Sequence, residues 1–188
     1  SRASRANDPD YRYGWGVIRL GSLPSAITAI RGHWAEIAVD WAFSDGITDG
    51  CPTVGALTCP DLPVTRDEMA RFLWRFRSTP VAAVAASFDD VATDASYGPA
   101  VDWLAEVGIT LGCTVTSYCP AGTVTRAEVA AFLWRLEGSP KGSIAANFSD
   151  VSTDFFAGPA IDWLLESGTT TGCTSSSYCP QGLVTRAE

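Results

Sequence analysis

The sequence predicts an all-α protein made of three helix–loop–helix units, because it repeats at long range and its apolar residues recur at helical spacing. Three sets of residues show the repeat: Cys59, Cys119 and Cys179; Arg66, Arg126 and Arg186; and Trp41, Trp103 and Trp163. The cysteines and arginines are spaced by 60 and 60 residues, and the tryptophans by 62 and 60. We therefore expect each unit to contain the same elements.

The second unit shows both expected helices most clearly. Its first helix begins at Gly98 and ends at Gly108, which suits a left-handed cap, and its second helix follows Val124. Apolar residues at i, i+3, i+4 and i+7 mark one face of each helix. They are Ala100, Trp103, Leu104 and Val107 in the first helix, and Val129, Phe132, Leu133 and Leu136 in the second.

The third unit repeats this pattern but stops at Glu188, the N3 position of its second helix, so we expect that closing helix to be missing. The apolar face of the unit's first helix, which begins at Gly158, would then be uncovered. Three things could cover it: a continuation of the chain, the apolar stretch from Trp15 to Ile30, or a partner chain, including a second copy. We favour a fragment of a longer protein. The first unit is less regular and lacks the Phe-x-Asp-Val segment of the other two.

The expected domain division follows the repeat. Residues 1–29 form an N-terminal extension that could be the tail of an upstream domain, and the units span 30–79, 88–137 and 148–188. Linkers rich in Ala, Ser, Gly and Pro separate the units. Each unit is too small to bury two amphipathic helices alone, so we expect the three to pack as one body.

The six cysteines are expected to form one short disulfide per unit. Equivalent copies would most simply pair Cys51 with Cys59, Cys113 with Cys119, and Cys173 with Cys179. Zinc is the alternative, but the spacings are not Cys-x-x-Cys and the single histidine, His33, lies far from all three pairs. Disulfides indicate an oxidising setting outside the cytoplasm.

A Thr-Arg-x-Glu segment precedes the second helix of each unit and has the spacing of a capping box. The capping residues are Thr65 and Glu68, Thr125 and Glu128, and Thr185 and Glu188. Capping explains Thr and Glu but not the arginine, because a cation in the first turn opposes the helix dipole. Two explanations remain open: each arginine binds an acidic ligand from outside, or each pairs with an acid of the next unit.

Composition excludes several functions. With 13 basic and 21 acidic residues, the net charge of −8 argues against a nucleic-acid partner. No apolar run reaches the roughly 18 residues of a membrane helix, and no intact signal peptide opens the sequence. We expect no enzyme, because no catalytic triad, distinctive carboxylate pair or phosphate loop is evident. We also expect no cofactor and no metal.

Five elements in fixed order resemble the S-layer homology domain over residues 32–188: Phe-x-Asp-Val, a helix, Gly-Ile-x-x-Gly, an aromatic residue before Cys-Pro, and Val-Thr-Arg-Ala-Glu. The resemblance implies a bundle with pseudo-three-fold symmetry on the bacterial cell surface or cell wall. It also implies that Arg66, Arg126 and Arg186 bind a secondary cell-wall polysaccharide, often a pyruvylated one, in grooves between units. Asp67 departs from the motif's Ala, and paired cysteines are not a general feature of that family.

The expected function is thus non-covalent anchoring of a surface or secreted protein to an acidic wall polysaccharide. Trp74 and Trp134 lie off the apolar stripe of the second helices, so they either stack on sugar rings or fill contacts between units. The alternative function is an extracellular protein–protein assembly module that uses the same grooves.

Overall fold

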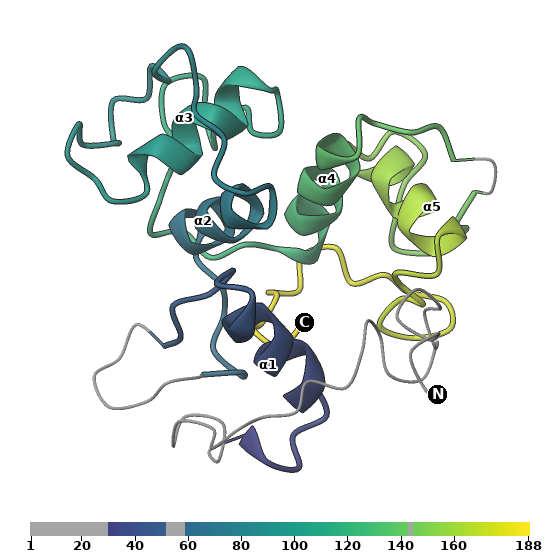
Figure 1. The fold of residues 1–188 in the computed structure, drawn as a ribbon. Helices are drawn as coiled ribbons and strands as arrows, with labels where there is room; N and C mark the ends of the chain where they lie inside the picture. The colour runs from purple at the N-terminus through teal and green to yellow at the C-terminus, as the bar shows by residue number, and fades with distance from the viewer. Residues whose placement is uncertain (1–29, 52–58, 143–144) are drawn as a thin grey trace, which may run out of the picture.

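The computed structural model describes residues 30–51, 59–142 and 145–188, and this part of the chain forms five α-helices and no β-strand (Figure 1). The helices are α1 (Glu36–Ser44), α2 (Arg66–Phe76), α3 (Gly98–Glu106), α4 (Arg126–Leu136) and α5 (Gly158–Glu166). The prediction of a helical protein is confirmed for these residues. The expectations for the N-terminal extension and for the stretch from Trp15 to Ala29 fall outside the described residues.

Local sequence explains where the helices begin. α3 and α5 each carry a proline in the first turn, Pro99 and Pro159, where the missing N–H would have had no helical partner. Thr65 and Thr125 are the N-cap residues of α2 and α4. Their backbones are extended, and the helical conformation begins at the next residue.

The helices pack across the unit boundaries: α2 of the first unit lies against α3 of the second, and α4 of the second lies against α5 of the third. Leu73 of α2 and Leu104 of α3 are buried in one apolar cluster. A second cluster joins Ala130 of α4 to Ile161 and Leu164 of α5. Each second helix therefore covers the first helix of the following unit.

This packing corrects one expectation from the sequence: α4 covers α5, and among the helices of the described residues it is α1 that no other helix covers. Ala38 of α1 is exposed, whereas its counterparts Ala100 and Ala160 are each 1% exposed. No residue of α1 is buried, although Trp41 makes an edge contact with Phe76 of α2. The residues before Glu188 lie beside α1 (Figure 1).

The segments that precede the second helices meet in a closed cycle of hydrogen bonds. The amide of Val64 donates to the carbonyl of Val184 at 2.9 Å, Val184 donates to Val124 at 3.0 Å, and Val124 donates to Val64 at 2.9 Å. All three side chains are buried. The cycle joins the first unit to the third, so the three units form one closed set.

All three expected disulfides are present, with Cα–Cα distances of 5.3 Å for Cys51–Cys59 and 5.9 Å for both Cys113–Cys119 and Cys173–Cys179. In the third unit the carboxylate of Asp150 accepts the amides of Tyr178 and Cys179, both at 2.8 Å. These bonds lower the pKa of Asp150, because they stabilise its charged form. The loop of the third unit is thus held by a covalent bond and a carboxylate.

The second unit repeats this arrangement around Asp90, whose carboxylate accepts the amides of Tyr118 and Cys119, both at 2.7 Å. Burial alone would raise the pKa of Asp90, but the two backbone hydrogen bonds outweigh it and the pKa is lowered. Tyr118 is fully buried below the loop, and its hydroxyl donates to the carbonyl of Arg66 at 2.7 Å. Burial raises the pKa of the Tyr118 phenol, which therefore stays protonated as a donor.

Candidate functional site

The Thr-Arg-x-Glu segments lie where one unit meets the next. Each junction therefore contains the arginine of one segment and the glutamate of another. In the second unit the capping box is complete: Thr125 accepts the amide of Glu128 at 3.3 Å, and Glu128 Oε2 accepts the amide of Thr125 at 2.8 Å. In the first and third units the amides of Thr65 and Thr185 donate to Glu68 and Glu188 at 3.1 and 3.0 Å. One oxygen of each glutamate thereby holds the helix start.

The other oxygen of Glu128 accepts a hydrogen bond from Arg66 of the preceding unit. Arg66 Nη1 lies 2.7 Å from Glu128 Oε1, and Arg66 Nε donates to the carbonyl of Tyr118 at 2.7 Å. The guanidinium lies 5.0 Å from the ring centre of Tyr118 and 5.6 Å from that of Phe132. Only 4% of Arg66 is exposed, so this junction is filled by its own residues.

Arg126 occupies the equivalent place at the second junction. Its Nη1 lies 3.5 Å from Glu188 Oε1, its Nε donates to the carbonyl of Tyr178 at 2.9 Å, and its guanidinium lies 4.9 Å from the Tyr178 ring. The side chain is 20% exposed, more than that of Arg66. The longer ion pair and the greater exposure make this a looser copy of the first junction.

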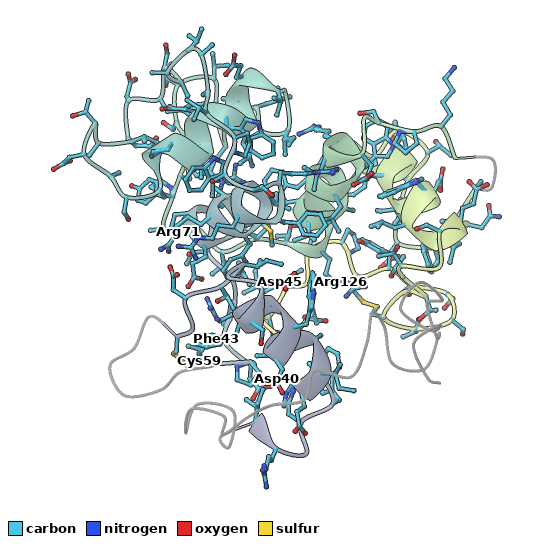
Figure 2. The ribbon with its side chains drawn as sticks, in the orientation of Figure 1. Asp40, Phe43, Asp45, Cys59, Arg71 and Arg126 are labelled. Atoms are coloured by element: carbon cyan, nitrogen blue, oxygen red, sulfur yellow. A yellow bond between two sulfur atoms is a disulfide. The ribbon has the colours of Figure 1, made fainter. Side chains whose placement is uncertain are left out.

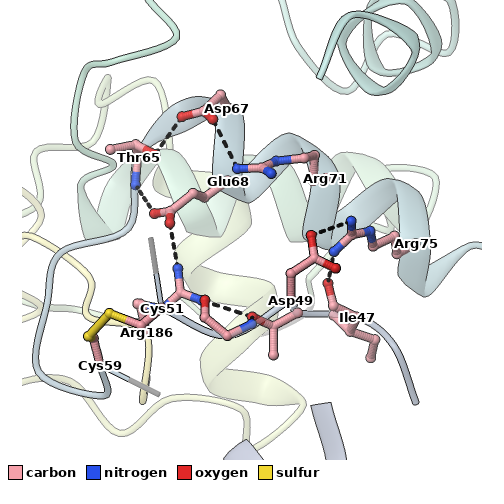
Figure 3. Close-up of polar contacts among 12 residues, drawn as sticks. Ile47, Asp49, Cys51, Cys59, Thr65, Asp67, Glu68, Arg71, Arg75 and Arg186 are labelled. Carbon is pink, nitrogen blue, oxygen red and sulfur yellow. Dashed lines mark hydrogen bonds and ion pairs between the residues drawn. A yellow bond between two sulfur atoms is a disulfide. The ribbon is translucent and has the colours of Figure 1, made fainter. Parts of the chain in front are cut away.

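Arg186 closes the set at the junction between the third and first units. Its Nη1 lies 2.6 Å from Glu68 Oε1, and its Nη2 donates to Thr48 Oγ1 at 2.8 Å and to the carbonyl of Gly50 (Figure 3). The geometry is therefore that of the pairing explanation: each arginine contacts the capping glutamate of the next unit. Binding of an acidic ligand by these arginines stays a prediction.

The third junction is also where the described residues leave a hollow. A pocket of about 110 Å³, here named the Arg186 pocket, lies at the junction. It is lined by Thr48, Asp49, Gly50, Cys51, Glu68, Arg71, Phe72, Arg75 and Arg186. Three guanidinium groups against two carboxylates make its lining net positive in a protein of net charge −8.

Arg71 and Arg75, two of these cations, were missed as site residues from the sequence. Arg75 Nη2 lies 2.5 Å from Asp49, and Arg71 Nη2 lies 3.1 Å from Asp67, one turn earlier on α2. Arg71 Nε is buried and has no hydrogen-bond partner within the described part of the chain, an uncommon state for a guanidinium donor. Figures 2 and 3 place Arg71 on α2. The sequence did contain a signal for Arg71: the equivalent position of the second unit is the small apolar residue Ala131, so the charge at this position is specific to the first unit when the two are compared.

Trp74 and Trp134 hold the linkers that leave their helices. Their indole Nε1 atoms donate to the carbonyls of Pro80 and Pro140, both at 2.7 Å, and both side chains are partly buried against the apolar clusters. They belong to α2 and α4 and do not line the Arg186 pocket. Stacking of these rings on a sugar stays a prediction.

Comparison with known proteins gives one family. Residues 87–130 match the model of the S-layer homology domain, and this stretch contains α3, the Cys113–Cys119 loop and the start of α4. Domains of that family are known for anchoring proteins to cell-wall polysaccharides at the cell surface. No curated protein matches the chain.

None of the helices in 30–51, 59–142 and 145–188 has the length and apolar character needed to cross a membrane. Over the same ranges, no group of three or more His, Cys, Asp and Glu side chains could hold a metal ion.

Proposed function

We propose that this chain anchors a bacterial cell-surface or secreted protein non-covalently to an acidic cell-wall polysaccharide and performs no catalysis on it. The observation that carries the proposal is the match of residues 87–130 to the S-layer homology domain. Most of these elements recur in the first unit, which lacks Phe-x-Asp-Val, and in the third, which stops at Glu188, and this recurrence supports extending the family to all three. The closed cycle of hydrogen bonds among Val64, Val124 and Val184 supports a pseudo-three-fold arrangement.

The Arg186 pocket is the proposed binding site. Its excess of guanidinium groups favours an anion, and Arg71, which has only Asp67 as an ion-pair partner among the described residues, contributes to the lining. We infer that a carboxylate substituent enters this hollow of about 110 Å³ while its sugar ring stays outside. A pyruvyl group on the polysaccharide has this size and charge. The first junction is a poorer candidate, because Arg66 is already enclosed by Glu128, Tyr118 and Phe132.

Binding to isolated cell walls tests this proposal. Arg71→Ala should weaken wall binding about tenfold, the loss of one charge-assisted hydrogen bond. Arg77→Ala is the matched control, because Arg77 pairs with Glu137 outside the pocket and its removal changes the net charge equally. We expect this control to bind as the unmodified chain does.

Chemical removal of the secondary polysaccharide should abolish binding. Equal binding by Arg71→Ala and the unmodified chain would reject the pocket, and binding to stripped walls would reject the polysaccharide. Oligomerisation that rises with protein concentration, without any wall binding, would favour the assembly function instead.

A further inference from the structure

The three disulfides differ in the charges around them. Asp90 accepts the amide of Cys119 at 2.7 Å, and Asp150 accepts the amide of Cys179 at 2.8 Å. A carboxylate therefore lies beside the disulfide of the second unit and beside that of the third. The first unit lacks the Phe-x-Asp-Val segment that provides this aspartate, so the sequence gives the Cys51–Cys59 disulfide a different setting.

A tyrosine also restrains the loops of the second and third units. The hydroxyls of Tyr118 and Tyr178 donate to the carbonyls of Arg66 and Arg126 at 2.7 and 3.0 Å. The equivalent position of the first unit is Thr58, which has no phenol to reach a neighbouring unit. The aspartate and the tyrosine are thus specific to the second and third disulfide loops.

Cys51 instead lines the Arg186 pocket, whose three guanidinium groups outnumber its two carboxylates (Figure 3). Both carboxylates are paired, Asp49 with Arg75 at 2.5 Å and Glu68 with Arg186 at 2.6 Å. Cations favour a thiolate both as the group that attacks a disulfide and as the group that leaves it. Cys51 therefore leaves more readily than a cysteine beside a carboxylate.

The Cys51–Cys59 disulfide also joins two segments that hold Arg186. Before Cys51, the carbonyl of Gly50 accepts a hydrogen bond from Arg186 Nη2. After Cys59, the carbonyl of Leu62 accepts the amide of Arg186 at 2.9 Å. The Cα atoms of the two cysteines are 5.3 Å apart, so the covalent bond keeps both segments at the junction between the third and first units.

We propose that the Cys51–Cys59 disulfide is a thiol–disulfide exchange site, which a dithiol reduces before the other two disulfides, and that its reduction loosens the junction at Arg186. This proposal concerns a covalent bond and the junction it holds. It does not depend on polysaccharide binding, so failure of the anchoring proposal leaves it untouched.

The exchange proceeds in two steps. A thiolate of the dithiol attacks Cys59 Sγ, the Cys51–Cys59 bond breaks, and Cys51 leaves with the electron pair as a thiolate beside the guanidinium groups. The second thiolate of the dithiol then attacks its own sulfur in the mixed disulfide, and Cys59 leaves as a thiolate. The dithiol is oxidised to a cyclic disulfide, the protein disulfide is reduced by two electrons, and the two protons of the dithiol pass to the solvent or to the cysteines.

The order of reduction tests the exchange site. Exposure alone predicts the opposite order, because Cys113 and Cys173 are exposed whereas Cys51 and Cys59 are half-buried. The folded full chain is incubated with dithiothreitol and alkylated with iodoacetamide, and mass spectrometry of its peptides then follows each cysteine. We expect Cys51 and Cys59 to be alkylated about tenfold faster than the other four. Equal rates, or earlier reduction of the exposed pairs, would overturn the proposal.

A variant of the pocket tests the role of its cations. Arg71→Ala should slow the reduction of Cys51–Cys59 about twofold, because one of the charges that favour the thiolate is removed. Arg77→Ala is the matched control, since Arg77 pairs with Glu137 outside the pocket, and it should leave the rate unchanged. Identical rates in the two variants would show that the cations do not select this disulfide and would overturn the proposal.

Hydrogen exchange after selective reduction tests the loosened junction. The amides of Arg186 and Ala187, which donate to the first unit, should exchange about tenfold faster than in the oxidised chain. The amides of Arg126 and Ala127 make the equivalent bonds at the second junction and should keep their protection. Unchanged exchange at Arg186 would overturn the proposal, and so would equal acceleration at both junctions, because that result indicates global unfolding.

Discussion

The arginines at the helix starts contribute to the fold because a neighbouring unit compensates for their unfavourable position. A cation in the first turn costs about 0.3–1 kcal/mol against the helix dipole at an exposed site. Arg66 recovers more than this through one carboxylate, one carbonyl and the faces of two aromatic rings. Removing one member of such a buried set would leave the other charge without a partner, which is more costly than the dipole effect.

The spacing of Thr and Glu predicted the helix starts, but it could not decide what the arginine contacts. The reason is that Glu128 has two roles, with one oxygen on the amide of Thr125 and the other on Arg66. A local motif reveals the first role only. The partner residue lies 62 positions away, and only the packing of the units brings it to the arginine.

Asp150 makes stability depend on pH in an identifiable direction. Its folded-state pKa is lowered, so its contribution is present above the unfolded value of about 3.9 and is lost as the pH falls through the lower folded value. Asp150→Asn should reduce the free energy of unfolding at pH 7 by no more than about 1 kcal/mol, because Asp150 is exposed and solvent screens its interactions. It should also make the fall in stability below about pH 4 shallower.

Urea unfolding at a series of pH values measures both effects. Asp154→Asn is the control, because Asp154 is exposed in the same unit and its substitution removes the same charge. If the two variants showed identical stability at pH 7, the loop bonds of Asp150 would have no energetic role.

At the scale of elements, each disulfide loop supports the helix start of the preceding unit. The segment just after Cys119 supplies the carbonyls of Pro120 and Gly122, which accept the amides of Asp67 and Arg66 at 3.0 and 2.8 Å. These are backbone donors that a helix start cannot satisfy internally. A loop in the second unit therefore satisfies the first turn of α2.

Replacing Cys113 and Cys119 together by Ser should destabilise the protein by about 2–3 kcal/mol. It should also speed hydrogen exchange at the first-turn amides of α2, in the other unit. The Cys173→Ser and Cys179→Ser double variant is the matched comparison, and its local effect should appear at α4 instead. Faster exchange confined to the unit that carries the substitutions would contradict this coupling.

The helices themselves were predictable from local spacing, but their partners were not. Apolar residues such as Trp103 and Leu104 mark the buried face of α3 without saying which helix covers it. The expectation of an uncovered α5 assumed that the two helices of one unit pack together. Instead, the second helix of one unit packs on the first helix of the next, as α2 does on α3 and α4 does on α5. In the described residues α5 is therefore covered by a helix, and α1 is not.

At the scale of the whole molecule, the net charge of −8 repels an anionic polymer at long range. Screening over about 8 Å at physiological salt weakens that repulsion, so the proposed wall binding would come from short-range contacts in the locally positive Arg186 pocket. We expect wall affinity to change by less than about tenfold between 50 and 500 mM salt. A steep decline, of the kind seen with phosphate binding, would contradict a pocket with so few cations.

The repeat period predicted three equivalent units, but the closure of the set could not be derived from it. The Val64–Val184 bond joins residues 120 positions apart, and no local pattern encodes such a contact. The resemblance to a known family implied a pseudo-three-fold bundle, and the three backbone hydrogen bonds join one segment of each unit.

The cycle of Val64, Val124 and Val184 has no first or last member, since each valine donates to one neighbour and accepts from the other. The Val64–Val184 bond spans 120 residues, whereas each of the other two spans 60, so the step that closes the ring carries a larger loop-closure entropy cost than either of them. A circularly permuted gene, opened in a linker between units, would encode the same ring in a different order.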